Sequence, residues 1–219
     1  KRLPVSANWR LLLDQELANI AVTDPELEEL VRTEKAAILE EVAQSRISVL
    51  IGPAGTGKTT LLSVLGRHDE ISRGGILLLA PTGKARVQMQ RNAEEGRAYT
   101  VAQFLTATGR YDGSTYRYRT IGKVGEHRAE TVIVDECSML TEEMLATLFE
   151  SLKGVKRWIL VGDPKQLPPI GPGRPFVDIV NQLAPENVDS IFPRVGPGYG
   201  ELTVRLRQGG QDRGDVRLA

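Results

Sequence analysis

The sequence is almost without cysteine, since Cys137 is the single one in a chain of 219 residues. An internal disulfide is therefore excluded, and a reducing compartment is expected. Histidine is also scarce, and His68 and His127 together with one cysteine do not make up a structural zinc site. The chain has no apolar run of the roughly 18 residues that span a bilayer and no signal-peptide pattern. We therefore expect a cytoplasmic protein with no membrane contact.

Net charge is absent as well, because 28 Lys and Arg residues balance 28 Asp and Glu residues. This balance argues against a protein that binds nucleic acid through its overall charge alone. The acids are unevenly placed: nine of them lie in residues 11–45, where Arg32 and Lys35 are the basic residues. We interpret this acidic stretch as a solvent-exposed helix face, which leaves the rest of the chain net basic.

Two helices are predicted in an N-terminal helical segment, residues 1–43. Residues 8–20 carry apolar side chains at helical spacing. Asp24 followed by Pro25 is typical of an N-cap with proline in the first turn, and the helix that begins there should run to about Ala43. Its acids are expected to point outward. The residues expected to point inward are Leu27, Leu30, Val31, Ala37 and Ile38.

From residue 47 the pattern changes to short apolar runs, at 47–51, 76–79, 132–134 and 158–161. Continuous apolar runs of this length are typical of strands that helices cover on both faces of a parallel sheet. Helices are expected between them, near 58–66, 84–92 and 142–152. The alternation predicts an α/β fold with a mostly parallel sheet and helices on both faces, over residues 44–208. Residues 195–200, rich in glycine and proline, are expected to form a loop.

The strongest motif is a full match to G-x-x-x-x-G-K-[ST], placed between an apolar strand and a helix. Its glycines let the backbone form a cup whose N–H groups point at phosphate oxygens, and the helix that follows adds the positive end of its dipole. Lys58 is expected to bridge the β- and γ-phosphates, and the Thr59 hydroxyl to bind Mg²⁺. The residues predicted to contact the nucleotide are Gly52, Pro53, Ala54, Gly55, Thr56, Gly57, Lys58, Thr59 and Thr60.

Three more polar residues follow predicted strands. Asp135 and Glu136 come directly after the run at 132–134, and in a parallel sheet that edge is where ligands bind. Asp135 is expected to hold Mg²⁺ and Glu136 to act as general base on the attacking water; alternatively, the pair caps the next helix. Gln166, in the proline-flanked loop 162–169, can hydrogen-bond a γ-phosphate oxygen and that water. Alternatively, the loop is a turn with no ligand contact.

Four segments resemble, in order, motifs I, Ia, II and III of superfamily 1 helicases, and the pattern is most similar to that of the RecD-like DNA helicases. These segments are residues 52–59, 80–85, 135–139 and 162–169. Residues 202–208 resemble motif IV, with Arg207 at the position of its γ-phosphate-sensing arginine. Residues 99–105 resemble a further DNA-contact motif. Over about residues 34–208, the resemblance implies a RecA-like P-loop NTPase fold.

The resemblance implies an ATP-dependent motor, with Mg²⁺, that moves 5′ to 3′ along single-stranded DNA and unwinds duplexes. In this family two RecA-like domains clamp ATP, so a second such domain of the same protein is an expected partner. Thr82, Lys84, Arg86 and Thr100 are implied to contact the DNA backbone, as donors that suit phosphates. Alternatively, Lys84 and Arg86 lie on a solvated helix face. Phe104 is interpreted as a core residue rather than a base-stacking platform.

The sequence departs from the family pattern at three points. Glu34 stands where RecD-like helicases usually have a glutamine that reads the adenine edge; alternatively, it faces solvent on its helix. Cys137 replaces the commoner alanine after the carboxylate pair and is expected to be a small buried residue. Motifs V and VI of a second motor domain are absent, so residues 209–219 are expected to begin that domain. Because the chain begins with Lys1, we expect it to be a piece of a longer protein.

An inserted subdomain is predicted at residues 108–130, which interrupt the helix–strand alternation. The Asp112-Gly113 step tolerates the positive φ of a tight hairpin, and residues 116–121 alternate rings and guanidinium groups as a two-faced strand does. RecD-like helicases insert a small subdomain over the DNA path at this point. We therefore expect a β-hairpin in which Arg117 and Arg119 face DNA phosphates; alternatively, the segment is a surface loop.

Two other functions stay open at this point. The chain could be the helicase module of a conjugative relaxase, whose DNA-contact segment looks similar, but a relaxase also needs a domain with clustered histidines and tyrosines. It could also be a non-catalytic module that binds DNA in response to nucleotide. The presence of Lys58, Glu136 and Gln166 argues against the second alternative.

Overall fold

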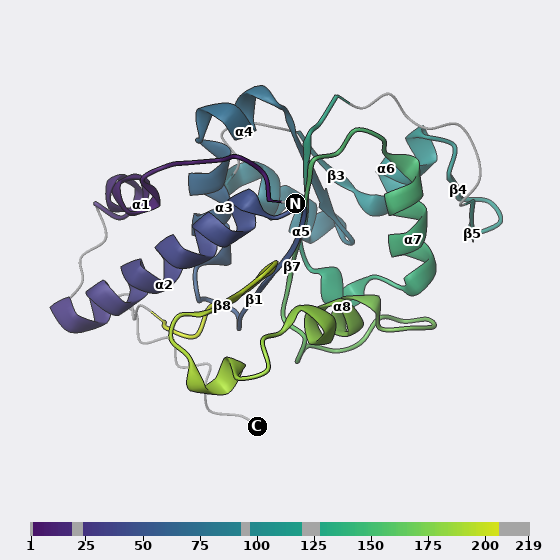
Figure 1. Cartoon of the computed structure of the whole chain (residues 1–219). Helices are drawn as coiled ribbons and strands as arrows, with labels where there is room; N and C mark the ends of the chain where they lie inside the picture. Colours follow the sequence, from purple (N-terminus) through teal and green to yellow (C-terminus); the bar gives the residue numbers. More distant parts are fainter. Residues whose placement is uncertain (1, 19–23, 93–96, 120–127, 206–219) are drawn as a thin grey trace.

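The structure, a computed structural model, describes residues 2–18, 24–92, 97–119 and 128–205 (Figure 1). Arg207 and residues 209–219 of the sequence-based predictions lie outside these residues.

Within the described residues, seven strands form one sheet in the order β3-β2-β6-β7-β1-β9-β8. Neighbouring strands run parallel, except that β8 runs antiparallel to β9. The sheet confirms the predicted α/β class and its mostly parallel character. In sheet order the strands are β3 (Arg97–Thr100), β2 (Ile76–Ala80), β6 (Thr131–Val134), β7 (Arg157–Gly162), β1 (Ile47–Ile51), β9 (Tyr199–Glu201) and β8 (Arg194–Gly196).

Helices cover both faces of this sheet, as the apolar strand patterns predicted (Figure 1). On one face the buried core takes its side chains from α1 (Trp9–Leu17), α2 (Pro25–Gln44), α3 (Lys58–Gly66), α4 (Asp69–Arg73) and α5 (Gly83–Asn92). On the other face it takes them from α6 (Val101–Ala107), α7 (Glu142–Ser151) and α8 (Pro175–Leu183). In the part of the chain that the structure describes, two short 3₁₀ turns, η1 (Cys137–Met139) and η2 (Val188–Ser190), lie in connections.

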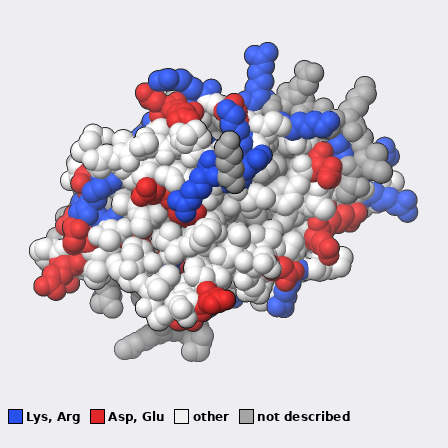
Figure 2. All heavy atoms as spheres, in the orientation of Figure 1, with Lys and Arg blue, Asp and Glu red and all other residues white. Residues whose placement is uncertain are grey.

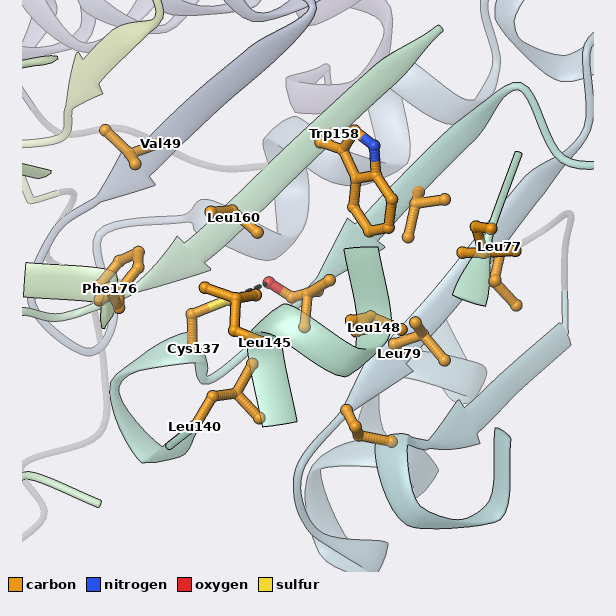
Figure 3. Packing of buried hydrophobic residues seen from close by; sticks show 14 of the residues in the cluster. Val49, Leu77, Leu79, Cys137, Leu140, Leu145, Leu148, Trp158, Leu160 and Phe176 are labelled. Carbon is orange, nitrogen blue, oxygen red and sulfur yellow. Dashed lines mark hydrogen bonds between the residues drawn. The ribbon is translucent and has the colours of Figure 1, made fainter. Parts of the chain in front are cut away.

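The side chains of β7 show why the strands read as continuous apolar runs. Trp158 and Leu160 point into one core (Figure 3), and Ile159 and Val161 belong to the other. The Trp158 ring meets the Phe149 ring of α7 edge to face, with 4.7 Å between ring centroids. Because successive strand residues point to opposite faces, a strand buried on both sides needs apolar residues at every position.

Helix α2 begins as the sequence predicts. The Asp24 carboxylate accepts hydrogen bonds from the N–H groups of Glu26 at 3.0 Å and Leu27 at 3.2 Å, and Pro25 occupies the first turn. The prediction that all its acids point outward is wrong, because Glu34 and Glu41 are buried. Leu30, expected to point inward, is 46% exposed.

Residues 195–200 were predicted to form a loop, and this is wrong. They contain the tight turn between β8 and β9, and both strands belong to the main sheet. The turn is anchored by Gly198, whose carbonyl accepts from the Val49 N–H at 2.8 Å and whose own N–H donates to the Glu41 carboxylate at 2.8 Å. Glycine and proline here favour the turn, while pairing with β1 makes the neighbouring residues a strand.

The predicted hairpin is present as β4 (Tyr111–Asp112) and β5 (Arg117–Tyr118), a separate two-stranded sheet. The rings of Tyr111 and Tyr118 lie 4.7 Å apart between centroids and pack against the core beneath α6 and α7. Positive φ falls on Tyr116 and not on the Asp112-Gly113 step, so the predicted turn geometry is wrong. Instead, the Asp112 carboxylate accepts from the Ser114 hydroxyl at 2.6 Å and from the Ser114 N–H at 2.9 Å, and these bonds lower its pKa to about 2.

Basic and acidic side chains are interspersed over the face drawn in Figure 2. On this face no large area carries charge of one sign, so binding of a nucleic acid to it would depend on individual residues more than on overall charge. Among the described residues, no helix combines the length and apolarity needed to cross a bilayer.

Candidate functional site

The predicted functional residues gather at the carboxyl-terminal edge of the sheet. The strands β3, β2, β6, β7 and β1 are neighbours and run parallel, so the segments that follow them lie side by side along this edge. The segment after β1 is the glycine-rich phosphate loop, residues 52–57. Asp135 and Glu136 follow β6, and the loop with Gln166 follows β7.

The phosphate loop is folded tightly against its surroundings. A Cβ on Gly52 would lie 2.9 Å from the Leu202 carbonyl oxygen, so glycine is required there. The Thr56 hydroxyl donates to the Pro53 carbonyl at 2.9 Å across the loop. Lys58, the first residue of α3, donates from Nζ to the carbonyls of Gly52 at 2.6 Å and Pro53 at 3.0 Å. The Lys58 ammonium thus contacts the first two carbonyls of the loop. Phosphate oxygens of a bound nucleotide would accept from the same ammonium.

Charges from three neighbouring segments act on Lys58. Burial lowers the pKa of its ammonium, and attraction to Asp135 and Asp163 partly offsets this effect. Arg205, in the segment after β9, lowers that pKa further through like-charge repulsion. Burial in turn raises the pKa of the Asp135 carboxyl, although the Glu136 N–H and the Lys58 charge favour its ionised form. An additional cation at this edge would favour ionised Asp135.

Asp135 and Thr59 were predicted to hold Mg²⁺, and their chemistry fits that ion. Both offer oxygen, which Mg²⁺ prefers. One oxygen of Asp135 accepts from the Glu136 N–H at 2.8 Å, which orients the carboxylate. The Thr59 side chain is exposed at the start of α3.

Glu136 has an unusual backbone conformation, with φ 52°. This left-handed conformation costs a non-glycine residue roughly 1–3 kcal/mol and is often found at functional sites. The Glu136 carboxylate accepts a bond from the Thr82 hydroxyl at 3.4 Å, and Thr82 itself accepts from the Ala85 N–H at 3.2 Å at the start of α5. One hydrogen bond therefore connects the predicted general base to a residue predicted to contact DNA.

Gln166 is exposed in the loop after β7, where two contacts orient it. Its N–H donates to the Asp163 carbonyl at 3.1 Å, and its side-chain oxygen accepts from the Ser138 hydroxyl at 3.3 Å. Ser138 was not singled out from the sequence. Its place two residues after Glu136 is the signal that could have indicated it, because it connects the segment after β6 to the loop after β7.

The residues predicted to contact DNA fall into two groups. Thr82 lies just after strand β2, and Thr100 is the last residue of the adjacent strand β3. Thr100 caps α6: its hydroxyl accepts from the Gln103 N–H, and the Gln103 side chain accepts from the Thr100 N–H. Lys84 is exposed on α5 and Arg86 is half-buried there. The second group is Arg117, on strand β5 of the hairpin, and Arg119, just after that strand, and both are exposed. Helix α6 lies between Thr100 and this hairpin in the chain. The structure brings the first group to the sheet edge but not the second.

Glu34 does not face solvent, so that interpretation is wrong. Its side chain is fully buried, and one of its oxygens accepts from the N–H of Thr203 at 2.7 Å and from the Thr203 hydroxyl at 2.5 Å. The Val204 N–H lies 3.3 Å from both oxygens. A contact between Glu34 and an adenine edge would require these bonds to break. Glu34 instead fixes the segment after β9 to α2.

Two interpretations of apolar residues are confirmed. Cys137 is fully buried, its thiol donates to the Val134 carbonyl at 3.1 Å (Figure 3), and burial raises its pKa. Phe104 is also buried, in the core beneath α6, where no base could stack on its ring.

Comparisons with known proteins agree with this geometry. Residues 30–217 match the family model described as AAA domain. The chain is 30% identical over 206 residues to the RecBCD enzyme subunit RecD of Mycolicibacterium smegmatis, which covers 85% of this chain and 37% of that protein. It is 31% identical over 202 residues to the ATP-dependent RecD2 DNA helicase of Deinococcus radiodurans, which covers 85% of this chain and 27% of that protein. The chain thus spans about a third of the length of these relatives.

The fold is also similar to that of a solved structure, a Pif1 helicase from Bacteroides in complex with ADP-AlF3 and single-stranded DNA. The TM-score is 0.51 at 22% identity, over 87% of this chain and 44% of that one. This similarity supports the RecA-like α/β fold.

Proposed function

Since this chain belongs to the AAA-domain family and is a motor domain of the RecD-like, superfamily 1 helicase type, we propose that it binds and hydrolyses ATP to drive movement along single-stranded DNA. The movement runs 5′ to 3′ and unwinds duplexes, and a second RecA-like domain of the same protein closes over the nucleotide. The observation that carries the proposal is the shared sheet edge, where Lys58, Glu136 and Gln166 follow three neighbouring parallel strands.

In the proposed reaction, the oxygen of a water molecule attacks the γ-phosphorus, and the bond to the β,γ-bridging oxygen breaks. Glu136 accepts the proton of that water, and ADP leaves with the electron pair of the broken bond. Lys58 and the N–H groups of the phosphate loop stabilise the charge that develops on the phosphate oxygens. Gln166, oriented by Ser138, positions the water. Mg²⁺ held by Thr59 and Asp135 would neutralise phosphate charge when bound.

The same edge supports a route from hydrolysis to DNA. Thr82 donates to the Glu136 carboxylate and also accepts from the Ala85 N–H in the first turn of α5, which carries Lys84. A phosphate of the DNA backbone that engages Thr82 would compete with this bond and change the position of the general base. Thr100, on the next strand, offers a second hydroxyl at the same edge.

Lys58→Ala tests the nucleotide site. We expect this substitution to weaken ADP and ATP binding by roughly 10- to 100-fold, the contribution of a charge-assisted hydrogen bond, and to abolish DNA-stimulated hydrolysis. Titration calorimetry with each nucleotide, and phosphate release with and without single-stranded DNA, measure the two effects. Lys153→Ala, at an exposed position before β7, is the matched control. Parent-like affinity in Lys58→Ala would refute the assignment of the phosphate loop.

Arg117 and Arg119 test the DNA path. Neutralising one phosphate contact on a single strand changes the slope of log affinity against log salt by about 0.7. Replacing both arginines by alanine should therefore flatten the slope by about 1.4 and lower single-strand affinity, while nucleotide binding stays intact. Fluorescence anisotropy with labelled oligonucleotide at several salt concentrations gives the slope. Arg46→Ala is the control, because Arg46 is exposed at the opposite edge of the sheet, just before β1. An unchanged slope in the double variant removes the hairpin from the DNA path.

A further inference from the structure

Lys35 lies on the inner side of α2, behind the phosphate loop. Only 3% of its surface is exposed, which is rare for lysine without a charged partner. Its Nζ donates to the Thr56 carbonyl oxygen at 2.6 Å. Within the described part of the chain, that carbonyl is the hydrogen-bond partner of the ammonium, and no carboxylate forms an ion pair with it. An ammonium in such a place costs free energy unless something compensates it.

The contact with Thr56 fixes one peptide unit of the loop. In a trans peptide the C=O and N–H point in opposite directions. When Lys35 holds the Thr56 carbonyl toward α2, the N–H of Gly57 must therefore point away from α2. Gly57 is the N-cap of α3, with φ 92°, so its N–H belongs to the set that faces a phosphate at the start of that helix.

Gly57 and Lys35 are also matched in shape. A Cβ on Gly57 would lie 2.7 Å from the Lys35 Nζ and 3.3 Å from its Cε. The ammonium therefore occupies the space beside the Gly57 backbone. Lys58 contacts the same loop at two other carbonyls, those of Gly52 and Pro53. Two ammonium groups thus hold different carbonyls of a single loop.

We propose that Lys35 is a positioning residue of the nucleotide site, which orients the Thr56–Gly57 peptide toward the phosphates and adds a second positive charge behind the loop. The inference rests on the proposed nucleotide site, because it names phosphate as the group that benefits. It differs from the role of Lys58, since Lys35 acts through the loop and does not touch the nucleotide.

The protonation of Lys35 should depend on whether a phosphate is bound. Burial lowers its pKa to about 8, and the Glu34 carboxylate beside it on α2 opposes this effect. The phosphate loop, residues 52–57, contains no titratable side chain, and α3 begins with the cation Lys58. A nucleotide polyphosphate favours charged Lys35 and raises its pKa, so binding takes up a proton where the free protein has lost it. The expected sign is a decrease in nucleotide affinity as the pH rises through about 8.

The test uses the 219-residue chain with Lys35→Met, which keeps side-chain length but removes the charge, and Lys35→Arg, which keeps a charge that does not titrate in this range. ADP with Mg²⁺ is titrated calorimetrically from pH 6.5 to 9.5, in two buffers that differ in ionisation enthalpy. Lys153→Met is the control for loss of a lysine. Circular dichroism and thermal melting establish that each variant is folded.

We expect Lys35→Met to weaken ADP binding roughly tenfold at pH 7, as loss of a charge-assisted hydrogen bond does. The parent should take up a proton on binding near pH 8, and both variants should lack this component. Burial also lowers the pKa of Lys58. Proton uptake by Lys58 on ADP binding is common to the parent and both Lys35 variants, so it cancels when their proton uptake is compared.

Two outcomes overturn the inference. One is parent-like affinity and proton uptake in Lys35→Met. The other, decisive even if Lys35→Met does not fold, is an undiminished fall in affinity near pH 8 in Lys35→Arg. If Lys58→Ala also binds ADP as the parent does, the nucleotide site itself is wrong. If Lys58→Ala loses binding while Lys35 variants do not, only the role of Lys35 fails.

Discussion

Glu136→Gln is expected to lower ATP turnover by roughly 10²–10⁴-fold, the usual loss when a general base is removed, while nucleotide affinity stays at the parent value. Glutamine has nearly the same size and shape as glutamate, and its amide oxygen can still accept the bond that the Thr82 hydroxyl now donates at 3.4 Å. The loop and Lys58 are untouched by the change. The variant therefore separates proton transfer from binding.

The measurement is single-turnover hydrolysis in a protein that contains this chain and a second motor domain, with ADP affinity measured on the same sample. Glu143→Gln is the matched control, because Glu143 is an exposed glutamate in the first turn of α7. Glu136 has a left-handed backbone, with φ 52°, so circular dichroism and thermal melting of Glu136→Gln are compared with the parent to separate a change in folding from the loss of the base. Hydrolysis at the parent rate in Glu136→Gln would show that another group accepts the proton.

The local part of this site could be predicted from the sequence. The phosphate loop and its two flanking elements are specified by contiguous residues: an apolar run, glycines that permit unusual backbone angles, and a helix that starts at Lys58. The same holds for Asp135 and Glu136, which follow a run that is buried on both faces. Each of these predictions needed only the order of residues along one stretch of chain.

The contacts made by α2 could not be predicted in that way. Glu34 and Lys35 lie in an acidic stretch that is typical of a solvated helix face, yet both are buried. Their partners are Thr203, Val204 and Thr56, which are distant in the sequence. Helical periodicity gives the face on which a residue lies, but it does not say that the opposite face meets a carbonyl or two N–H groups that need a partner.

Strands β8 and β9 were missed for a related reason. Gly196, Pro197 and Gly198 dominate the local composition and favour a turn. The residues around them become strands because β9 pairs with β1, with Leu50 opposite Gly200. The packing is close, since a Cβ on Gly200 would lie 2.7 Å from the Ile38 side chain. Strand formation there depends on tertiary contact more than on local propensity.

A second motor domain is expected to raise ATP hydrolysis by this chain by roughly 10³–10⁵-fold, the factor that an arginine contributed to the transition state can supply. In this chain the proposed site is open to solvent on one side. Thr59 and Gln166 are exposed at the sheet edge, and so are Ala54 and Gly55 of the phosphate loop. Water therefore reaches the groups that would stabilise the developing charge, and their electrostatic effect is weakened.

The 219-residue chain alone should accordingly bind nucleotide weakly, hydrolyse it slowly and leave a forked duplex intact. Phosphate release and fluorescent strand displacement measure these properties, and the same assays on a protein with both domains give the reference rates. Lys58→Ala of the single-domain chain accounts for any contaminating helicase. Strand separation by the 219-residue chain that disappears in Lys58→Ala would show that one RecA-like domain is sufficient. It would place the arginine that completes the site within this chain, where Arg207 is the candidate.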